Sequence, residues 1–317
     1  MRELSLVIPV FNEAEIIVAA VDTILAELKS IDDLDYFELI IVDDGSSDGT
    51  WKLLIEVLCP RYAEIRAIKL SRNFGKESAL CAGLELCDAQ ATIIMDADLQ
   101  HPPVLIKDML RLWREGSVDI VDAVKRDRGD EPAISRLSAN GFYAVFERLS
   151  GVGLKNASDF KLLDKRVVAA WREMPEKNLF FRGMSAWVGF NRKEIQFDVA
   201  PRLGSDSKWS ALGLFRLALT SIVSFSSAPL HLITLSGVAF ILFSIVLGVI
   251  TLAQHFSGEA VSGFATVILL LLIIGGVIMV SLGIIGEYLA RIYNEVKARP
   301  RYLIAEDSRD SKIERDA

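Results

Sequence analysis

The sequence predicts an α/β domain with a mostly parallel sheet, followed by an interfacial helix and two membrane-spanning helices. Short apolar runs alternate with helix-like stretches over the first 125 residues, which is the pattern of parallel strands joined by helices. Two later apolar runs, Pro229–Phe256 and Gly263–Leu289, contain no lysine or arginine. Each run exceeds the roughly 20 apolar residues that span a bilayer.

The first strand is expected at Leu4–Val10, a continuous apolar run typical of a buried parallel strand. A helix is expected over Glu15–Leu28, and the same alternation then repeats. The later elements are strands at Glu38–Val42, Ile65–Leu70, Ala91–Met95 and Asp119–Ala123, helices at Trp51–Leu58, Lys76–Cys87 and Ile134–Leu149, and a mobile loop at Lys125–Glu131. Polar clusters follow the strands, and open α/β sheets bind ligands at that edge.

We divide the chain into residues 1–205 as the α/β domain, 206–228 as the interfacial helix, 229–290 as the two spans and 291–317 as a cytoplasmic helix end with a tail. Trp209–Phe225 is apolar with the single charge Arg216, which is typical of a helix at the membrane surface. The chain from Ala305 is highly charged, so we expect that tail to be disordered.

Positive charge predicts the orientation of the spans. Basic residues flank the hairpin on both sides, while the link Ser257–Ser262 carries only Glu259. The flanking residues are Arg202, Lys208, Arg216, Arg291, Lys297, Arg299 and Arg301. Since basic residues stay in the cytoplasm, we predict a multi-pass protein of the inner or plasma membrane with the α/β domain cytoplasmic. The alternative is a buried hairpin in a soluble core, for which little covering chain remains.

Composition excludes some classes of partner. The 317 residues are 51% hydrophobic and carry a formal net charge of −7, which argues against nucleic acid. Cys59, Cys81 and Cys87 form no metal-ligand or paired pattern. Cys81 and Cys87 lie on a predicted helix, and we expect them to be core thiols in a reducing compartment. The N-terminus begins with a strand and lacks the basic region of a signal peptide, so no signal peptide is expected.

Asp96-Ala97-Asp98 at the end of a predicted strand is the sharpest candidate site. Two carboxylates two residues apart can hold one Mg²⁺ or Mn²⁺ beside substrate phosphates. Such a pair can also serve a turn or a helix cap. The strand before it and Leu99–Pro103 after it favour the metal site.

A second polar cluster, Asp43–Thr50, follows the second strand. We assign Asp48 to capping the next helix and Gly45 to a tight turn. Asp44 is the candidate for accepting a hydrogen bond from a nucleobase N–H. Neither G-x-G-x-x-G nor a P-loop pattern occurs, so dinucleotide and P-loop chemistry are not indicated.

Together these motifs resemble the family 2 glycosyltransferases of the GT-A fold. The resemblance covers residues 4–300, and its motifs are Val7–Glu13, Val42–Asp48, Arg72–Lys76, Asp96–Pro103, Phe181–Phe190 and the C-terminal hairpin. Within that family the chain is similar to polyprenyl-phosphate glycosyltransferases, near the GtrB-type bactoprenol glucosyltransferases and more distantly the dolichol-phosphate mannose synthases.

The resemblance implies an enzyme with a nucleotide-sugar site and a Mg²⁺ or Mn²⁺ cofactor. It places the nucleotide pocket at Pro9, Phe11 and Glu13, with Asp44 at the base and Lys76 near the base and phosphates. The implied catalytic residues are Asp96 and Asp98 at the diphosphate and metal, and Gln100 beside them near the sugar and acceptor.

The acceptor phosphate has two candidate binding regions. Arg126 and Arg128, next to Lys125, form a basic cluster on the predicted loop, although solvated surface charge is the alternative. Arg202, Ser207 and Lys208 resemble the family's stretch before the interfacial helix, but Gly204 stands two residues after the arginine instead of three. Asp159 is a candidate to orient the acceptor or act as a base, or else a turn residue.

The implied reaction is inverting transfer of a hexose, with glucose from UDP-glucose favoured, to an undecaprenyl- or dolichyl-type phosphate at the cytoplasmic membrane face. The expected partners are a UDP-sugar, the polyprenyl phosphate and the membrane, with self-association and a separate lipid-sugar flippase left open. One rival is a processive polysaccharide synthase, although such enzymes have more spans and a Gln-x-x-Arg-Trp segment absent here. Another is a non-catalytic scaffold, against which Asp96 and Asp98 argue.

Overall fold

The structure, a computed structural model, describes residues 3–125, 157–174, 176, 181–198, 228–257 and 263–310. The chain divides into two compact units, one of Met1–Ser210 with Arg299–Ala317 and one of Ala211–Ala298. Several predicted features lie outside the described residues. They are the loop after Lys125, the helix at Ile134–Leu149, the interfacial helix, and Arg126, Arg128, Arg202, Ser207 and Lys208.

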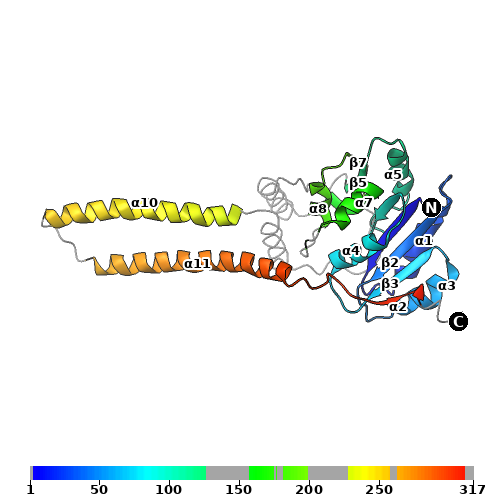
Figure 1. The fold of residues 1–317 in the computed structure, drawn as a ribbon, viewed down its shortest axis with the longest axis horizontal. Coiled ribbons are helices and arrows are strands. Elements are labelled where there is room, and N and C mark those ends of the chain that lie inside the picture. Colours follow the sequence, from blue (N-terminus) through cyan, green and yellow to red (C-terminus); the bar gives the residue numbers. More distant parts are fainter. Residues whose placement is uncertain are drawn as a thin grey trace. The chain divides into compact units, whose positions relative to one another are not determined.

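The first unit is built on a sheet whose described part has eight strands in the order β7-β5-β6-β4-β1-β2-β3-β8 (Figure 1). The strands are β1 Leu4–Val10, β2 Phe37–Asp43, β3 Ile65–Leu70, β4 Ala91–Ile94, β5 Ile120–Lys125, β6 Ala157–Asp164, β7 Arg192–Phe197 and β8 Ile304–Asp307. Four of the seven pairings are parallel, including β4-β1-β2-β3 at the centre. The predicted α/β class and all five predicted strands are therefore confirmed.

Helices cover both faces of this sheet. Within the described chain of the first unit they are α1 Ile17–Lys29, α2 Thr50–Leu53, the π-helix η1 Leu54–Leu58, α3 Cys59–Arg61, α4 Lys76–Leu86, α5 Leu105–Arg114, α7 Lys165–Arg172 and α8 Phe181–Trp187. The helices α1, η1 and α5 contribute to one buried cluster, while α4 packs on β1 and β2 and α7 and α8 pack on β6. The helix predicted at Trp51–Leu58 is present as α2 and η1, a helical run that changes from α to π geometry at Leu54 and continues into α3.

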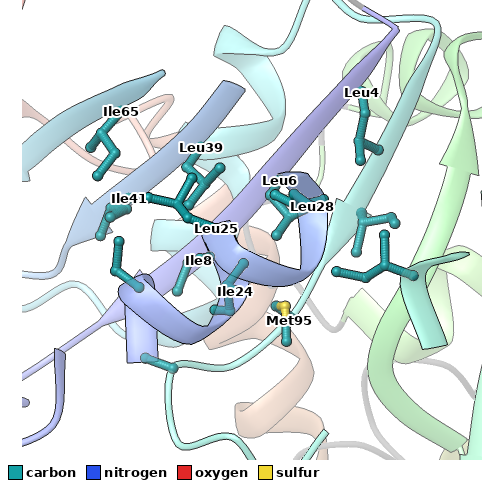
Figure 2. Packing of buried hydrophobic residues seen from close by; sticks show 14 of the residues in the cluster. Leu4, Leu6, Ile8, Ile24, Leu25, Leu28, Leu39, Ile41, Ile65 and Met95 are labelled. Atoms are coloured by element: carbon teal, nitrogen blue, oxygen red, sulfur yellow. The ribbon is translucent and has the colours of Figure 1, made fainter. Parts of the chain in front are cut away.

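The main core lies between β1 and α1 (Figure 2). Alternate residues of β1 (Leu4, Leu6 and Ile8) and one face of α1 (Ile24, Leu25 and Leu28) are at most 2% exposed. Burying each such side chain contributes about 1.5–3 kcal/mol. This packing fixes the position of β1 and so of the loop at its carboxyl end.

The opposite face of β1 meets α4 closely because α4 carries a glycine at the contact. A Cβ built on Gly83 would lie 2.3 Å from Cγ1 of Val7 and 3.4 Å from Cγ2 of Val42. Only glycine lets α4 approach this closely. The first turn of α4, which begins at Lys76, is thereby held against the strand ends.

The strand β8 corrects the expectation that the chain from Ala305 is disordered. Ile304–Asp307 pairs antiparallel with β3 at the sheet edge. The backbone N–H of Ser308 donates to the carbonyl oxygen of Ala67 in the same strand, and the Ser308 side-chain oxygen accepts the Ala67 N–H. The charges that suggested disorder have partners: Arg66 binds Asp307 at 2.6 Å, and Arg309 binds the buried Glu38 at 3.0 Å. We call residues Leu303–Arg309 the C-terminal strap.

The second unit contains two long helices, α10 Ala228–Phe256 and α11 Phe264–Val296. Their apolar windows, Ile233–Ile250 and Ile273–Val296, have mean hydropathies of 2.6 and 1.9, and no part of either window is buried. At 1.5 Å per residue, the 29 residues of α10 span about 44 Å, which exceeds a bilayer core of about 30 Å. By length and composition both helices are able to cross a membrane, and their exposure does not support the buried-hairpin alternative.

Candidate active site

A pocket of about 270 Å³ opens at the carboxyl ends of β1, β2 and β4, beside the first turn of α4. These three parallel strands are neighbours in the sheet, so the loops that follow them meet at one edge. The pocket is lined by Pro9, Val10, Phe11, Glu13, Asp44, Asn73, Gly75, Lys76, Ala79, Asp96, Ala97 and Asp98. Every residue that the sequence placed in the nucleotide pocket or at the metal is in this set, while Gln100, expected near the sugar and acceptor, is not.

The loop after β2 is packed against the loop after β3. Gly45 has a φ of +73°, and a Cβ on it would lie 2.5 Å from the carbonyl carbon of Arg72, so only glycine fits. This close approach brings Asp44 to the backbone N–H groups of Phe74 and Gly75, which donate to its two oxygens at 2.7 and 2.8 Å.

Asp44 is only 3% exposed. Burial raises the pKa of the Asp44 carboxyl, and the two backbone N–H donors oppose that rise. Asp44 therefore orders the loop that leads to Lys76, a role the sequence did not indicate. Its expected contact with a nucleobase stays a prediction.

The loops after β1 and β2 are tied together by side-chain hydrogen bonds. Asn12 has a φ of +54°, and its side-chain oxygen accepts the Ser47 N–H at 2.9 Å. Asp48 accepts the N–H of Ala14 at 3.0 Å and the N–H of Thr50, the first residue of α2, at 3.0 Å. The N-cap position of α2 is Gly49 and not the predicted Asp48, which binds the first N–H of the helix from one residue earlier. These bonds fix the rim of the pocket beside β1.

The carboxylates of Asp96 and Asp98 fit a hard divalent cation. The Asp96 side chain is 26% exposed, while Asp98 is 8% exposed and accepts the N–H of Gln100 at 3.1 Å. No group of three or more His, Cys, Asp or Glu side chains gathers in the part of the chain that the structure describes. Two carboxylates leave most of a six-coordinate shell open, which suits Mg²⁺ or Mn²⁺ shared with phosphate oxygens. Gln100 does not line the pocket itself.

Lys76 connects the pocket to β6. Its Nζ lies 2.6 Å from Oδ1 of Asp96 and 2.8 Å from Oδ2 of Asp159. Desolvation opposes the charged amine, but the two carboxylates outweigh it and raise the pKa of Lys76 above its ordinary range. Lys76 therefore carries a firm positive charge between two carboxylates from different strands.

Asp159 lies within β6, which excludes the turn alternative. Its carboxylate accepts two hydrogen bonds from Arg182 of α8, at 2.7 and 3.0 Å, besides the bond from Lys76. Burial favours the neutral acid, but Lys76 and Arg182 outweigh burial and lower the pKa of Asp159 below its ordinary range. A carboxylate of that kind is a weak base and a strong anchor for cations.

Arg182 and Glu77 are functional candidates that sequence reasoning missed. Glu77 follows Lys76 on α4, and its Oε2 accepts the N–H of Phe181 at 2.8 Å. Burial raises the pKa of Glu77 to about 7. The motif Phe181–Phe190 indicated this region, but no role could be assigned to its arginine without the contact to Asp159.

His101, three residues after Asp98, is a buried side chain that packs against two phenylalanine rings. It is 6% exposed, stacks on Phe160 at 5.3 Å and meets Phe197 edge-on at 5.6 Å. The ring therefore contacts one side chain of β6 and one of β7. Burial lowers the pKa of the His101 ring, although Asp96 and Asp98 oppose that shift.

Two family models match this chain, one within each of its two units. Residues 5–169 match the family described as glycosyl transferase family 2, and residues 228–292 match the one described as GtrB C-terminal hairpin. The first match takes in the pocket residues from Pro9 to Asp98 and also Asp159.

Relatives align over nearly the whole chain. An uncharacterized glycosyltransferase of Synechocystis is 41% identical over 309 residues, covering 96% of this chain and 95% of that protein. A prophage bactoprenol glucosyl transferase homolog of Escherichia coli K12 is 35% identical over 306 residues, with 95% and 98% covered. A bactoprenol glucosyl transferase of Shigella phage SfII is 35% identical over 311 residues, with 97% and 99% covered.

A solved structure with a similar chain trace is glucosyl-3-phosphoglycerate synthase from Mycobacterium tuberculosis in complex with Mn²⁺, uridine diphosphate and phosphoglyceric acid. It is 20% identical with a TM-score of 0.49, and the match covers 70% of this chain and 78% of that one.

Proposed function

Because the chain belongs to glycosyl transferase family 2 and is a glycosyltransferase, we propose that it transfers a hexose to a polyprenyl phosphate. The donor is UDP-glucose, the acceptor is an undecaprenyl- or dolichyl-type phosphate, and the reaction inverts the anomeric carbon. The acceptor rests on the relatives named bactoprenol glucosyl transferase and on the hairpin match. The two apolar helices supply the membrane anchor that a lipid acceptor requires.

The observation that carries the proposal is the composition of the pocket at the strand ends. Its lining includes the ring of Pro9 and the exposed ring of Phe11, which suit the flat face of a nucleobase. It also includes Lys76, Asp96 and Asp98, which suit a diphosphate with its cation. A nucleoside diphosphate needs both kinds of surface within one pocket.

The chemistry requires positioning and charge neutralisation more than proton transfer. A phosphate monoester is already ionised at pH 7. One of its oxygens forms a bond to the anomeric carbon as the bond from that carbon to the diphosphate oxygen breaks, and the nucleoside diphosphate leaves. Asp96 and Asp98 would hold a Mg²⁺ or Mn²⁺ ion, which when bound offsets the negative charge of the leaving diphosphate.

The remaining residues near the pocket would set the geometry of this displacement. Lys76 adds a fixed positive charge beside the diphosphate subsite. Asp159, anchored by Arg182, would hold Lys76 in place instead of acting as a base, since Lys76 and Arg182 lower its pKa. Arg126, Arg128, Arg202, Ser207 and Lys208 remain our candidates for binding the acceptor phosphate.

The experiment is a panel of radiolabelled UDP- and GDP-sugars, each with undecaprenyl or dolichyl phosphate and either Mg²⁺ or Mn²⁺. The full-length protein is assayed in detergent, and lipid extracts are separated after the reaction. We expect one hexose per lipid phosphate, with the opposite anomeric configuration to that of the donor. No labelled lipid from any donor would contradict the proposal, and long glycan products would instead indicate a processive synthase.

A further inference from the structure

Lys76 is placed where it can act as a counter-ion for the metal-binding carboxylates. Its Nζ contacts Asp96 at 2.6 Å, and Asp96 follows directly after β4 in the pocket wall. Among the residues that the structure describes, Lys76 is the cation that pairs with Asp96. A divalent cation that binds Asp96 must therefore weaken or break this ion pair.

The second contact of Lys76 differs from the first. Asp159 is 8% exposed and also accepts two hydrogen bonds from Arg182, so it keeps a cationic partner when Lys76 moves. The Asp96 side chain is 26% exposed and faces the pocket, where an incoming ligand can reach it. The bond between Lys76 and Asp96 is therefore the one that a ligand can exchange.

A diphosphate lowers the energetic cost of replacing Lys76 by a divalent cation at Asp96. Its oxygens complete the shell of a divalent cation on Asp96 and Asp98, and they also offer a new anionic partner to the ammonium group of Lys76. A cation arriving alone offers Lys76 no such partner and adds a second positive charge beside it. The energetic cost of breaking the ion pair is thus offset only when the diphosphate arrives.

We propose that Lys76 occupies Asp96 as an internal cation in the donor-free enzyme, so that the divalent cation binds together with the nucleoside diphosphate and not before it. This coupling rests on the proposed function, since it assumes a diphosphate donor. The positive charge of Lys76 thereby makes cation affinity depend on the presence of the donor.

The test measures Mn²⁺ binding directly, without any turnover. Full-length protein in detergent is titrated with Mn²⁺, and the free ion is quantified by its paramagnetic resonance signal, with and without UDP or GDP. The variants are Lys76→Met, Lys76→Arg and the matched surface control Lys52→Met. Lys52 pairs with Glu56 at 3.8 Å on an exposed helix face. Lys52→Met therefore changes the net charge by the same amount as Lys76→Met, but at a position outside the pocket. Melting curves establish that each variant is folded.

Without nucleotide, Lys76→Met is expected to bind Mn²⁺ roughly fivefold more tightly than the wild type, as expected for loss of a partly exposed competing ion pair. Lys76→Arg and Lys52→Met stay within about twofold of the wild type. UDP should raise the Mn²⁺ affinity of the wild type about tenfold or more, and that of Lys76→Met by less. Adding Asp98→Asn to Lys76→Met should remove the tight site, which locates it at the predicted carboxylates.

Nucleotide-free Mn²⁺ binding that is no tighter in Lys76→Met than in the wild type would overturn the inference. A different failure identifies the proposed function as the error. If UDP and GDP leave Mn²⁺ affinity unchanged in every variant while Lys76→Met still binds Mn²⁺ more tightly, the donor assignment is wrong. In that case the competition between Lys76 and the cation for Asp96 is supported, but its coupling to a nucleoside diphosphate is not.

Discussion

The guanidinium group of Arg182 on α8 donates two hydrogen bonds to the carboxylate of Asp159 on β6, at 2.7 and 3.0 Å. The same carboxylate accepts a bond from Lys76 of α4 at 2.8 Å. One buried carboxylate therefore holds two cations from two helices. This arrangement predicts a positioning role for Asp159.

Asp159→Asn should lower turnover about tenfold or more, because a neutral amide holds Lys76 and Arg182 less firmly. The measurement is initial rate against pH between 6 and 9. If Asp159 only positions Lys76 and Arg182, the rate of the variant should be lower at every pH and the shape of the pH profile should not change. If Asp159 were a general base, its protonation would produce the acidic limb of the profile, and loss of that limb in the variant would contradict our assignment.

Asp98→Asn should abolish sugar transfer while the protein still folds, because one of the two carboxylates that we propose to hold the cation is lost. Excess chelator should do the same to the wild-type protein. The matched control is Asp108→Asn on α5, whose exposed carboxylate pairs with Arg111 at 3.2 Å. Labelled lipid and a melting curve are measured for each variant. Full activity in chelator would remove the cation from the mechanism.

Glu77→Gln should flatten the dependence of stability on pH. Burial raises the pKa of Glu77 from its ordinary value of 4.5 to about 7. Between these values the folded protein keeps a proton that the unfolded chain has lost, so stability from this group falls as pH rises from about 5 to 7. The glutamine still accepts the Phe181 N–H but cannot ionise.

The measurement for Glu77 is the difference in Tm between pH 5 and pH 7.5. This difference should be smaller in Glu77→Gln than in the wild type. Glu56→Gln, on an exposed helix face, serves as the control and should behave as the wild type. Equal pH slopes in all three proteins would show that Glu77 has an ordinary pKa.

Asp307→Ala tests the C-terminal strap. Asp307 accepts hydrogen bonds from Nε and Nη2 of Arg66 at 3.2 and 2.6 Å, and both side chains are at least four-fifths buried. Their loss should cost about 1–3 kcal/mol and lower the Tm by several degrees. Lys52→Ala, which removes an exposed pair, should change stability by less than about 0.5 kcal/mol. A Tm shift no larger than that control would mean that the strap contributes little.

The orientation of the hairpin predicts a labelling pattern. An impermeant thiol reagent applied outside the cell should modify Ser262→Cys, because the link between the spans lacks basic residues. Asp32→Cys, an exposed position of the catalytic unit, should react only after the cytoplasmic face is opened. Background is expected to be low since Cys59, Cys81 and Cys87 are buried. The reverse pattern would invert the predicted topology.

The sequence predicted the centre of the sheet and singled out residues that line one pocket, because both depend on local patterns. A buried parallel strand such as β1 is a continuous apolar run, and strand-end motifs such as Asp96-Ala97-Asp98 are contiguous. The strand β6 was missed because Asp159 and Lys161 interrupt its apolar pattern. Both charges are buried against partners far away in sequence, and Asp159 and Lys76 are 83 residues apart.

The same reason explains why the C-terminal strap was predicted to be disordered. Its residues are charged, and composition alone favours solvation over a strand. The partner of Asp307 is Arg66, 241 positions earlier, so no local pattern reveals the ion pair. Long-range charge pairing is the feature that single-sequence reasoning overlooked at both places.

The pairing of β8 with β3 bears on how a soluble fragment of this enzyme should be designed. Truncation before the hairpin would expose the N–H and C=O groups of β3 as an open sheet edge, a template for pairing between molecules. It would also leave the buried Glu38 without Arg309 and Arg66 without Asp307. A fragment that joins residue 198 to residue 299 through a flexible linker would keep β8 on β3 together with both ion pairs.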